Sequence, residues 1–203
     1  MDGAEEARTP GAAWLRSPIW LVMFAIVLTA LIVSSISGRP LFKLGGGKPT
    51  IAPKEYRDDD QGFSLTYPGN WQKLGPEESA KLQGAFAFAI RRSKPEALFS
   101  VKTQEIKSGN VDLNQVAKAL NKEMPKNFRH FKKLGQSVVD VNGSRALQYN
   151  YIFLAQPRVT IREELTIIPT RKKVFHLTAW SSTKNFGRVQ SDFKRITGSF
   201  AVR

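Results

Sequence analysis

The chain has 203 residues, of which 41% are hydrophobic and 24% are charged. This length suits one domain with an appendage and is too short for two ordinary domains, and the composition excludes a collagen-like or wholly disordered chain. Lys and Arg total 31 against 17 Asp and Glu, so the formal net charge is +14 and the pI is about 10.2. Because cysteine is absent, disulfides, thiolate zinc sites and cysteine nucleophiles are excluded.

The N-terminal part contains one long apolar run. Residues 1–17 are polar and rich in small residues, which is typical of a flexible tail. From Ile19 to Val33 every residue except Thr29 is apolar, and through Ile36 the run reaches 18 residues without a charge, where a membrane-spanning helix needs roughly 20. We therefore predict a transmembrane signal anchor over residues 18–37. The residues expected inside the bilayer are Trp20, Leu21, Val22, Phe24, Ile26, Leu28, Leu31 and Ile32.

Cleavage and orientation of this segment stay open at the level of sequence. The small residues at 35–37 are compatible with a signal-peptide cleavage site after Ser37, but the run is long for a cleaved peptide, which favours an uncleaved anchor. Basic residues flank the run almost equally on both sides, so charge does not set its orientation. Residues 38–55 contain three consecutive glycines and three prolines and are predicted to form a linker before a domain over residues 56–203.

The first half of the domain is predicted to form strands followed by a helix. Alternating apolar residues predict strands at Phe63–Tyr67 and at residues 85–90 and 98–106. The period then changes, and apolar residues from Leu113 to Met124 share one helical stripe. Asp112, with Gln115 three residues later, resembles a capping box at the start of this helix, and Pro125 is expected to stop or kink it.

The second half is predicted to form antiparallel hairpins and a final helix. Asn142-Gly143 is a strong signal for a two-residue hairpin turn. A last helix is expected over residues 186–196, with Gly198 as its C-cap. Together these elements predict an α+β domain in which an antiparallel β-sheet of about five to seven strands is covered by helices. The strands predicted in this half are residues 138–141, 147–153, 159–167 and 174–180.

Both ends of the domain resemble PsbP-like domains, the family of photosystem II oxygen-evolving accessory proteins and their bacterial PsbP-like and DcrB-like relatives. The resemblance rests on GFSLTYPGNW (Gly62 to Trp71) at the opening, preceded by Tyr56 and an acidic run, and on VFHLTAWSST and FKRITGSF (Phe193 to Phe200) at the close. It implies an α/β/α sandwich that lies outside the cytoplasm, often tethered, and acts by binding. The long anchor departs from the photosynthetic members, so a photosystem role is one option within the family.

No pattern typical of catalysis or metal binding is found, and we expect no enzyme activity, metal or cofactor. His130 lies in a basic stretch that would repel a cation, and His176 is predicted to be a satisfied, half-buried histidine in a strand. Asp58–Asp60 could supply Ca²⁺ ligands, but the other EF-hand ligands are missing, which favours a solvated turn. Glu163 and Glu164 are adjacent in a strand, so they point to opposite faces and cannot act as a pair.

The positive charge is concentrated in the linker and the domain. Residues 1–39 hold three basic and three acidic side chains, so the remainder carries 28 basic against 14 acidic groups. A solvated surface that maintains solubility is one explanation, and a binding surface is the other. The residues predicted to contact a partner are Arg91, Arg92, Lys94, Lys126, Arg129, Lys132, Lys133, Arg171, Lys172 and Lys173.

We therefore expect a single-pass membrane protein with an extracytoplasmic C-terminal domain, in the periplasm, a lumen or at the cell surface. The domain is expected to be a non-catalytic accessory or assembly subunit that docks on an acidic protein subunit or on an anionic lipid surface. Nucleic acid is disfavoured as a partner, since no nucleic-acid-binding motif is found. The alternative is a small-ligand or lipid-binding module with a pocket between sheet and helix. The residues predicted to line that pocket are Phe86, Phe88, Tyr149, Tyr151 and Trp180.

Overall fold

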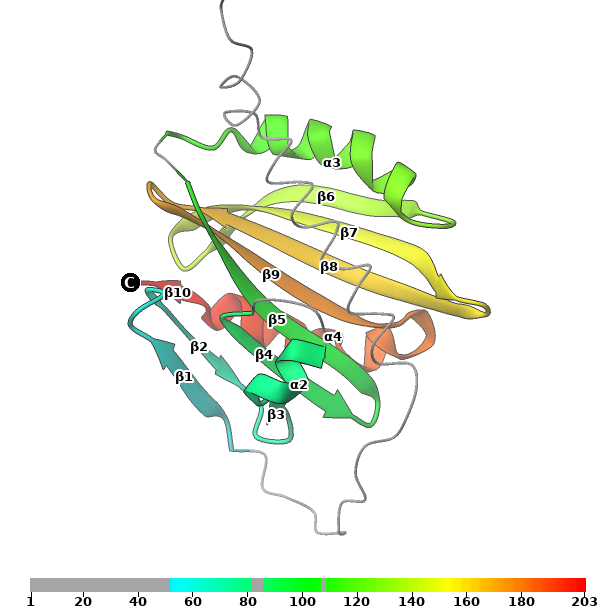
Figure 1. The fold of residues 1–203 in the computed structure, drawn as a ribbon, viewed down its shortest axis with the longest axis horizontal. Coiled ribbons are helices and arrows are strands. Elements are labelled where there is room, and N and C mark those ends of the chain that lie inside the picture. The colour runs from blue at the N-terminus through cyan, green and yellow to red at the C-terminus, as the bar shows by residue number, and fades with distance from the viewer. Residues whose placement is uncertain (1–51, 82–85, 107–108) are drawn as a thin grey trace, which may run out of the picture.

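The computed structural model describes residues 52–81, 86–106 and 109–203, so the predicted tail, the anchor and most of the linker lie outside the described residues. Its largest element is a seven-stranded antiparallel sheet with the strand order β3-β4-β5-β9-β8-β7-β6 (Figure 1). The strands are β3 (Gln72–Lys73), β4 (Phe88–Ser93), β5 (Glu96–Glu105), β6 (Lys132–Val141), β7 (Ser144–Gln156), β8 (Val159–Pro169) and β9 (Lys173–Ser182).

A second, three-stranded sheet was not predicted. It consists of β1 (Lys54–Asp58), β2 (Phe63–Tyr67) and β10 (Ala201–Val202) in the order β1-β2-β10. The first strand begins at Lys54, shortly before the predicted domain start at residue 56. Because β10 contains only two residues and pairs with a strand at the other end of the sequence, no local pattern indicates it.

Three helices are described, α2 (Pro76–Lys81), α3 (Leu113–Asn127) and α4 (Thr183–Ser199). The helix α3 lies along one face of the large sheet beside β6 and β7, and α4 packs on the other face together with the small sheet (Figure 1). We call these the α3 face and the α4 face. The predicted α+β class, with a sheet of up to seven strands covered by helices, is therefore confirmed.

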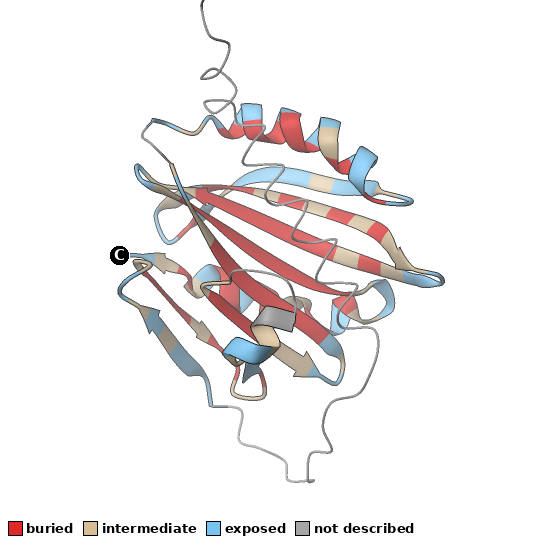
Figure 2. Ribbon diagram, viewed as in Figure 1, coloured by how far each residue is buried: buried red, intermediate tan, exposed pale blue. Residues whose placement is uncertain are grey.

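Each face of the large sheet has its own hydrophobic core, because alternate residues of a strand point to opposite faces. Leu120, Tyr149 and Trp180 belong to the core beneath α3, whereas Phe175 and Phe193 belong to the core beneath α4. The central strands are buried along most of their length (Figure 2). The predicted apolar stripe of α3 is confirmed, since its members are all buried; these are Leu113, Val116, Ala117, Leu120 and Met124.

Local turn chemistry agrees with the sequence at the β6–β7 hairpin. Asn142 and Gly143 have φ angles of 48° and 78°, as a two-residue turn of this kind requires, and Val141 pairs with Ser144 across it. The predicted helix ends are less accurate. Pro125 lies inside the last turn of α3, and α4 continues through Gly198 to Ser199, so that Phe200 is the C-cap.

Among the residues that the structure describes, no helix has the length and apolarity needed to cross a bilayer. The predicted anchor at residues 18–37 lies outside them.

We predict that Gly69→Ala destabilises the domain by about 1–3 kcal/mol, the usual cost of overpacking. A Cβ at Gly69 would lie 2.3 Å from the carbonyl oxygen of Ala52, where the chain enters the domain. The matched control is Gly187→Ala in α4, where the added methyl group meets nothing within 4 Å. This control should raise the free energy of unfolding by about 0.5–1 kcal/mol, because alanine favours helix. Urea unfolding of both variants tests the contrast, and equal shifts would contradict it.

Candidate functional site

The register of the large sheet gathers two of the three predicted basic clusters at one end. Arg92 on β4 pairs with Ala97 on β5, and Ala97 pairs with Ser181 on β9. These three residues therefore lie at the end of the sheet where β4 and β5 are joined. The segment between α3 and β6 reaches the same end, because the Leu154 amide donates to the Arg129 carbonyl oxygen at 2.8 Å. This end lies at the right of Figure 1.

Basic side chains greatly outnumber acidic ones on the turns and element ends at this end of the sheet. Within the described ranges, nine basic side chains and two carboxylates lie there, and we call this surface the basic end. The basic residues are Arg91, Arg92, Lys94, Lys126, Arg129, Lys132, Lys133, Arg158 and Lys184, and the acidic residues are Glu96 and Glu123.

The third predicted cluster, Arg171–Lys173, lies at the opposite end of the sheet. Lys173 pairs with Glu105 at the far end of β5, and its ammonium group donates to the carbonyl oxygens of Asp60 and Gln61 at 3.3 and 3.2 Å. Eight residues separate Ala97 from Glu105, so the two ends of the sheet are roughly 27 Å apart along the strands. The three clusters therefore do not form one surface.

Charge at this opposite end is balanced within the described residues. Six basic side chains lie there with six carboxylates. The basic residues are Arg57, Arg145, Arg171, Lys172, Lys173 and Arg203, and the acidic residues are Asp58, Asp59, Asp60, Glu105, Asp112 and Asp140.

Several side chains of the basic end are already engaged within the domain. Arg92 forms an ion pair with Asp192 at 2.8 Å, Lys126 forms one with Glu123 at 3.0 Å, and the Lys133 ammonium group donates to Asn121 at 3.0 Å. Within the described part of the chain, the charges that remain exposed and outside such pairs include Lys94, Arg129, Lys132, Arg158 and Lys184. These charges are the ones available to an external partner.

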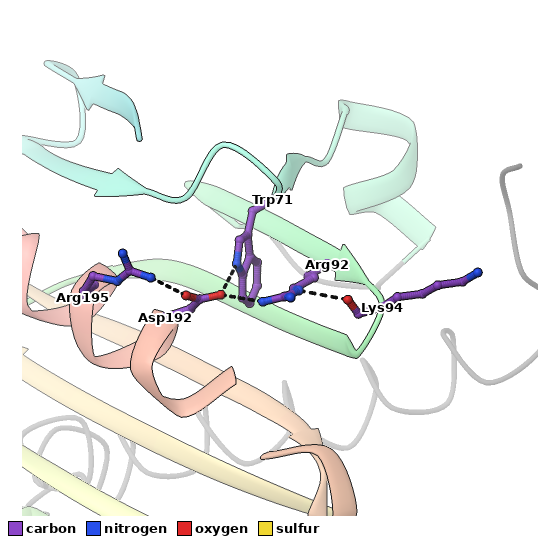
Figure 3. A network of polar contacts seen from close by, with 5 residues as sticks. All are labelled: Trp71, Arg92, Lys94, Asp192 and Arg195. Carbon is purple, nitrogen blue, oxygen red and sulfur yellow. Dashed lines mark hydrogen bonds and ion pairs between the residues drawn. The ribbon is translucent and has the colours of Figure 1, made fainter. Parts of the chain in front are cut away.

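The carboxylate of Asp192 ties the edge of the sheet to α4 (Figure 3). It accepts hydrogen bonds from Trp71 Nε1 at 3.1 Å, from Arg92 at 2.8 Å and from Arg195 at 2.7 Å. Asp192 is only 6% exposed, so these donors replace the water that a buried carboxylate loses. The sequence assigned Arg92 to partner binding, and the structure shows that it has this internal role.

A band of buried polar side chains crosses the α3 face of the central strands. Lys102 pairs in register with His176, and both are at most 5% exposed. Burial lowers the pKa of Lys102 to about 8, and burial together with the Lys102 charge lowers the pKa of His176 to about 4. Within the described ranges, neither ring nitrogen of His176 has a hydrogen-bond partner. The prediction of a satisfied, half-buried histidine is therefore wrong.

The same band contains a buried carboxylate. Glu163 is fully buried on β8 and accepts a hydrogen bond from the Tyr151 hydroxyl group. Glu164 points to the α4 face, which confirms that the two adjacent carboxylates are separated by the sheet. Amine, imidazole and carboxylate groups are therefore all present in this band, and each of the three side chains is at most 5% exposed.

The predicted aromatic pocket is split by the sheet. Tyr149, Tyr151 and Trp180 belong to the core beneath α3 and Phe86 packs against it, whereas Phe88 belongs to the core beneath α4. None of these five residues lines the cavity of about 370 Å³ that the structure shows beside the start of α3 and the β8–β9 turn. Its lining is formed by residues 110–114, Arg145 and residues 169–171.

The acidic turn between β1 and β2 is held by local contacts. Asp58 accepts hydrogen bonds from the Gln61 amide at 2.9 Å and from the Tyr56 hydroxyl group at 3.0 Å, while Asp59 pairs with Arg57. In the ranges that the structure describes, no group of three or more His, Cys, Asp or Glu side chains has the geometry of a metal site. His130 is exposed in a turn with a φ of 51°.

Comparison with known proteins identifies the fold family. Residues 52–202 match the family model of PsbP. The chain belongs to the PsbP family. This finding confirms the resemblance seen at the two ends of the domain sequence. A search of curated protein sequences finds no match.

Solved structures share the fold of this PsbP domain at low sequence identity. Cyanobacterial PsbP (CyanoP) from Synechocystis sp. PCC 6803 has 18% identity and a TM-score of 0.57, covering 81% of this chain and 100% of that chain. LpqN, involved in cell envelope biogenesis of Mycobacterium tuberculosis, has 17% identity and a TM-score of 0.54, covering 76% and 92%. A protein from Bacteroides thetaiotaomicron VPI-5482 has 14% identity and a TM-score of 0.51, covering 74% of this chain and 48% of that chain.

We predict that Asp192→Ala lowers the free energy of unfolding by about 2–3 kcal/mol. The substitution leaves the Trp71 indole N–H without its acceptor and removes the carboxylate that pairs with the largely buried Arg92 guanidinium, whose Nε keeps the Lys94 carbonyl oxygen. Asp59→Ala is the matched control, because its pair with Arg57 is exposed, and it should change stability by at most about 0.5 kcal/mol. Urea denaturation followed by tryptophan fluorescence measures both, and a similar loss for the two variants would refute the role of Asp192.

We also predict an acid-sensitive contribution from His176. Because its pKa is lowered from 6.5 to about 4 in the folded state, the unfolded chain binds more protons between these values, and stability falls as the pH drops. The contribution between pH 7 and pH 5 is about 2 kcal/mol. His176→Gln should remove this part of the pH dependence. Urea unfolding at the two pH values tests it, and an unchanged difference between them in the variant would count against the assignment.

Proposed function

We propose that this PsbP-family chain is a membrane-anchored, non-catalytic accessory subunit that docks its basic end on an acidic subunit of a membrane complex. One observation carries the proposal: at one end of the sheet the turns and element ends hold nine basic side chains against two carboxylates, with the buried Asp192 pairing Arg92 behind them, while charge at the other end is balanced. A surface that only maintained solubility would not require this asymmetry.

The chain enters the domain close to the basic end. The Ala52 carbonyl group lies against Gly69, in the turn that leads into β3, and Gln72 of β3 pairs with Arg91. A predicted anchor at residues 18–37 would therefore be joined to the domain beside this end rather than beside the opposite one. Tethering raises the effective concentration of the basic end for a partner in the same membrane.

Long-range electrostatics then supply orientation. Complementary potentials steer two proteins into register and accelerate their encounter, whereas like charges exclude wrong partners. The exposed and unengaged charges are Lys94, Arg129, Lys132, Arg158 and Lys184, so they form the docking set that we propose. Arg171–Lys173 is left out of this set because it lies roughly 27 Å away.

The relatives support a role at a cell boundary. LpqN is described as involved in cell envelope biogenesis, and the resemblance to PsbP-like domains implies a position outside the cytoplasm. We extend that location to this chain as part of the proposal. Anionic lipid headgroups are the other surface that the same charges could contact, and the experiment below separates the two.

We predict that the double variant Arg129→Glu/Lys132→Glu abolishes partner docking. The full chain is extracted from its native membranes in mild non-ionic detergent at low salt, and its apparent size is measured by gel filtration. The wild-type chain should migrate in a complex at low salt and as a free chain in about 1 M salt, where the Debye length is about 3 Å. The variant should migrate as a free chain even at low salt, because two attractive charges have become repulsive.

The matched control is Arg171→Glu/Lys172→Glu, which makes the same change in net charge at the opposite end and should keep the complex. Equal loss from both variants would show that net charge alone matters. A wild-type chain that elutes alone at low salt, yet sediments with vesicles containing phosphatidylserine, would replace the acidic subunit with a lipid surface. Either result overturns the proposal.

A further inference from the structure

The strand β6 forms an unusually long exposed edge of the large sheet. It has ten residues and, among the described strands, pairs only with β7, and nine of its ten residues are exposed or partly exposed (Figure 2). The other edge of the same sheet is β3, which has two residues. Proteins normally shorten or cover edge strands, because every second residue of an edge offers free N–H and C=O groups to another chain.

The edge is guarded most strongly over its first part, and Asp140 is the one charged side chain further along it. Lys132 and Lys133 begin the strand, and the register with β7 shifts between Lys133 and Gly135, both of which are devices that discourage pairing. From Gly135 to Val141 the strand pairs with β7 residue by residue, without proline or lysine. A regular stretch of seven residues is long enough to template a further strand.

Apolar side chains are exposed along this edge. Leu134 is 44% exposed and Val138 is 45% exposed, and these are the two largest values among the large hydrophobic side chains of the described residues. Scattered exposed apolar residues are normal, but here two of them lie four residues apart on an open strand. An added strand would cover both while it satisfied the backbone groups of β6.

We propose that β6 receives an extended segment of the acidic partner, which adds to the large sheet as a further strand. This inference rests on the proposed function, because β6 begins within the basic end at Lys132. Main-chain hydrogen bonds would supply affinity, and alternate side chains would supply specificity. The segment that fits places apolar side chains against Leu134 and Val138, and Asp or Glu beside Lys132 and Lys133.

Charge favours this partner over a second copy of the chain. Two copies paired antiparallel through β6 would set the basic end of each copy beside the charge-balanced end of the other, so no acidic surface would meet the basic end, and two chains of net charge +14 would repel each other. The single carboxylate on β6, Asp140, does not offset that repulsion. An acidic segment meets attraction at Lys132 and Lys133, where β6 begins.

Site-directed cross-linking in native membranes tests the inference. The chain lacks cysteine, so single cysteines can be placed at β6 with Ser137→Cys, at the basic end with Lys184→Cys and at the opposite end with Val202→Cys, and each is labelled with a benzophenone maleimide. We expect the labels at positions 137 and 184 to capture the same membrane protein, and the label at 202 to capture none. Mass spectrometry should place the adduct of position 137 in a segment rich in Asp and Glu.

A charged substitution on the β6 edge provides the second test of the inference. Adding Val138→Glu to the position-137 chain should reduce that adduct about tenfold or more, because it opposes a like charge and removes an apolar contact. Val202→Glu makes the same charge change at an exposed valine elsewhere and should leave the adduct intact. Val138→Thr adds no charge and keeps the strand propensity, so it should also leave the adduct intact. Urea midpoints close to wild type show that these variants are folded.

The outcomes separate this inference from the proposed function. If position 184 captures an acidic protein and position 137 does not, docking at the basic end stands and the β6 inference is overturned. An adduct of position 137 with a second copy of the chain, or with lipid alone, also overturns it, as does a full adduct in the Val138→Glu variant. If neither position captures a protein, the proposed function and the β6 inference both fail.

Discussion

The register of the seven-stranded antiparallel sheet is the constraint on which the charge distribution depends. Each hairpin returns the chain to one of two ends, so the residues of every turn are assigned to an end by strand pairing alone. Turns that are remote in sequence, such as those at Lys94 and Arg158, thereby share one end, and Arg171 is placed at the other. If one pair of strands shifted its register, different charged side chains would lie beside one another, and a partner would meet a different surface.

The strand period produced by the same pairing explains why the domain has two cores. Along β9, Val174 and Trp180 point beneath α3 while Phe175 and Leu177 point beneath α4, so both faces of the sheet need cover. The core beneath α4 is apolar and is joined to the sheet edge through Asp192. The α3 face instead contains the buried pair of Lys102 and His176. Such groups oppose stability and are tolerated only because the surrounding apolar contacts exceed their cost.

Much of the fold follows from the sequence, because its signals are local. The Asn142-Gly143 turn and the stripe of α3 are each encoded within a few residues, and both are found. The pairing of β10 with β2 was not found because it joins distant segments, and the first half of β6 has no alternation because an edge strand is exposed on both faces. The basic residues were identified individually, but their division between two ends, and the use of Arg92 by Asp192, are properties of tertiary pairing.

Electrostatic attraction and strand addition have complementary ranges, which is why we place both at one end of the molecule. Charge acts over about a Debye length and steers an acidic surface toward the basic end, but it is tolerant of sequence and poor at fixing register. Backbone pairing acts only at contact, yet it fixes register to the residue. The strand β6 begins among the lysines and continues as an open edge toward Val141, so a segment attracted at one end of β6 lies in line with its regular part. Neither feature requires catalysis, and the shared fold of the PsbP family supplies the rigid sheet that holds them in fixed relation.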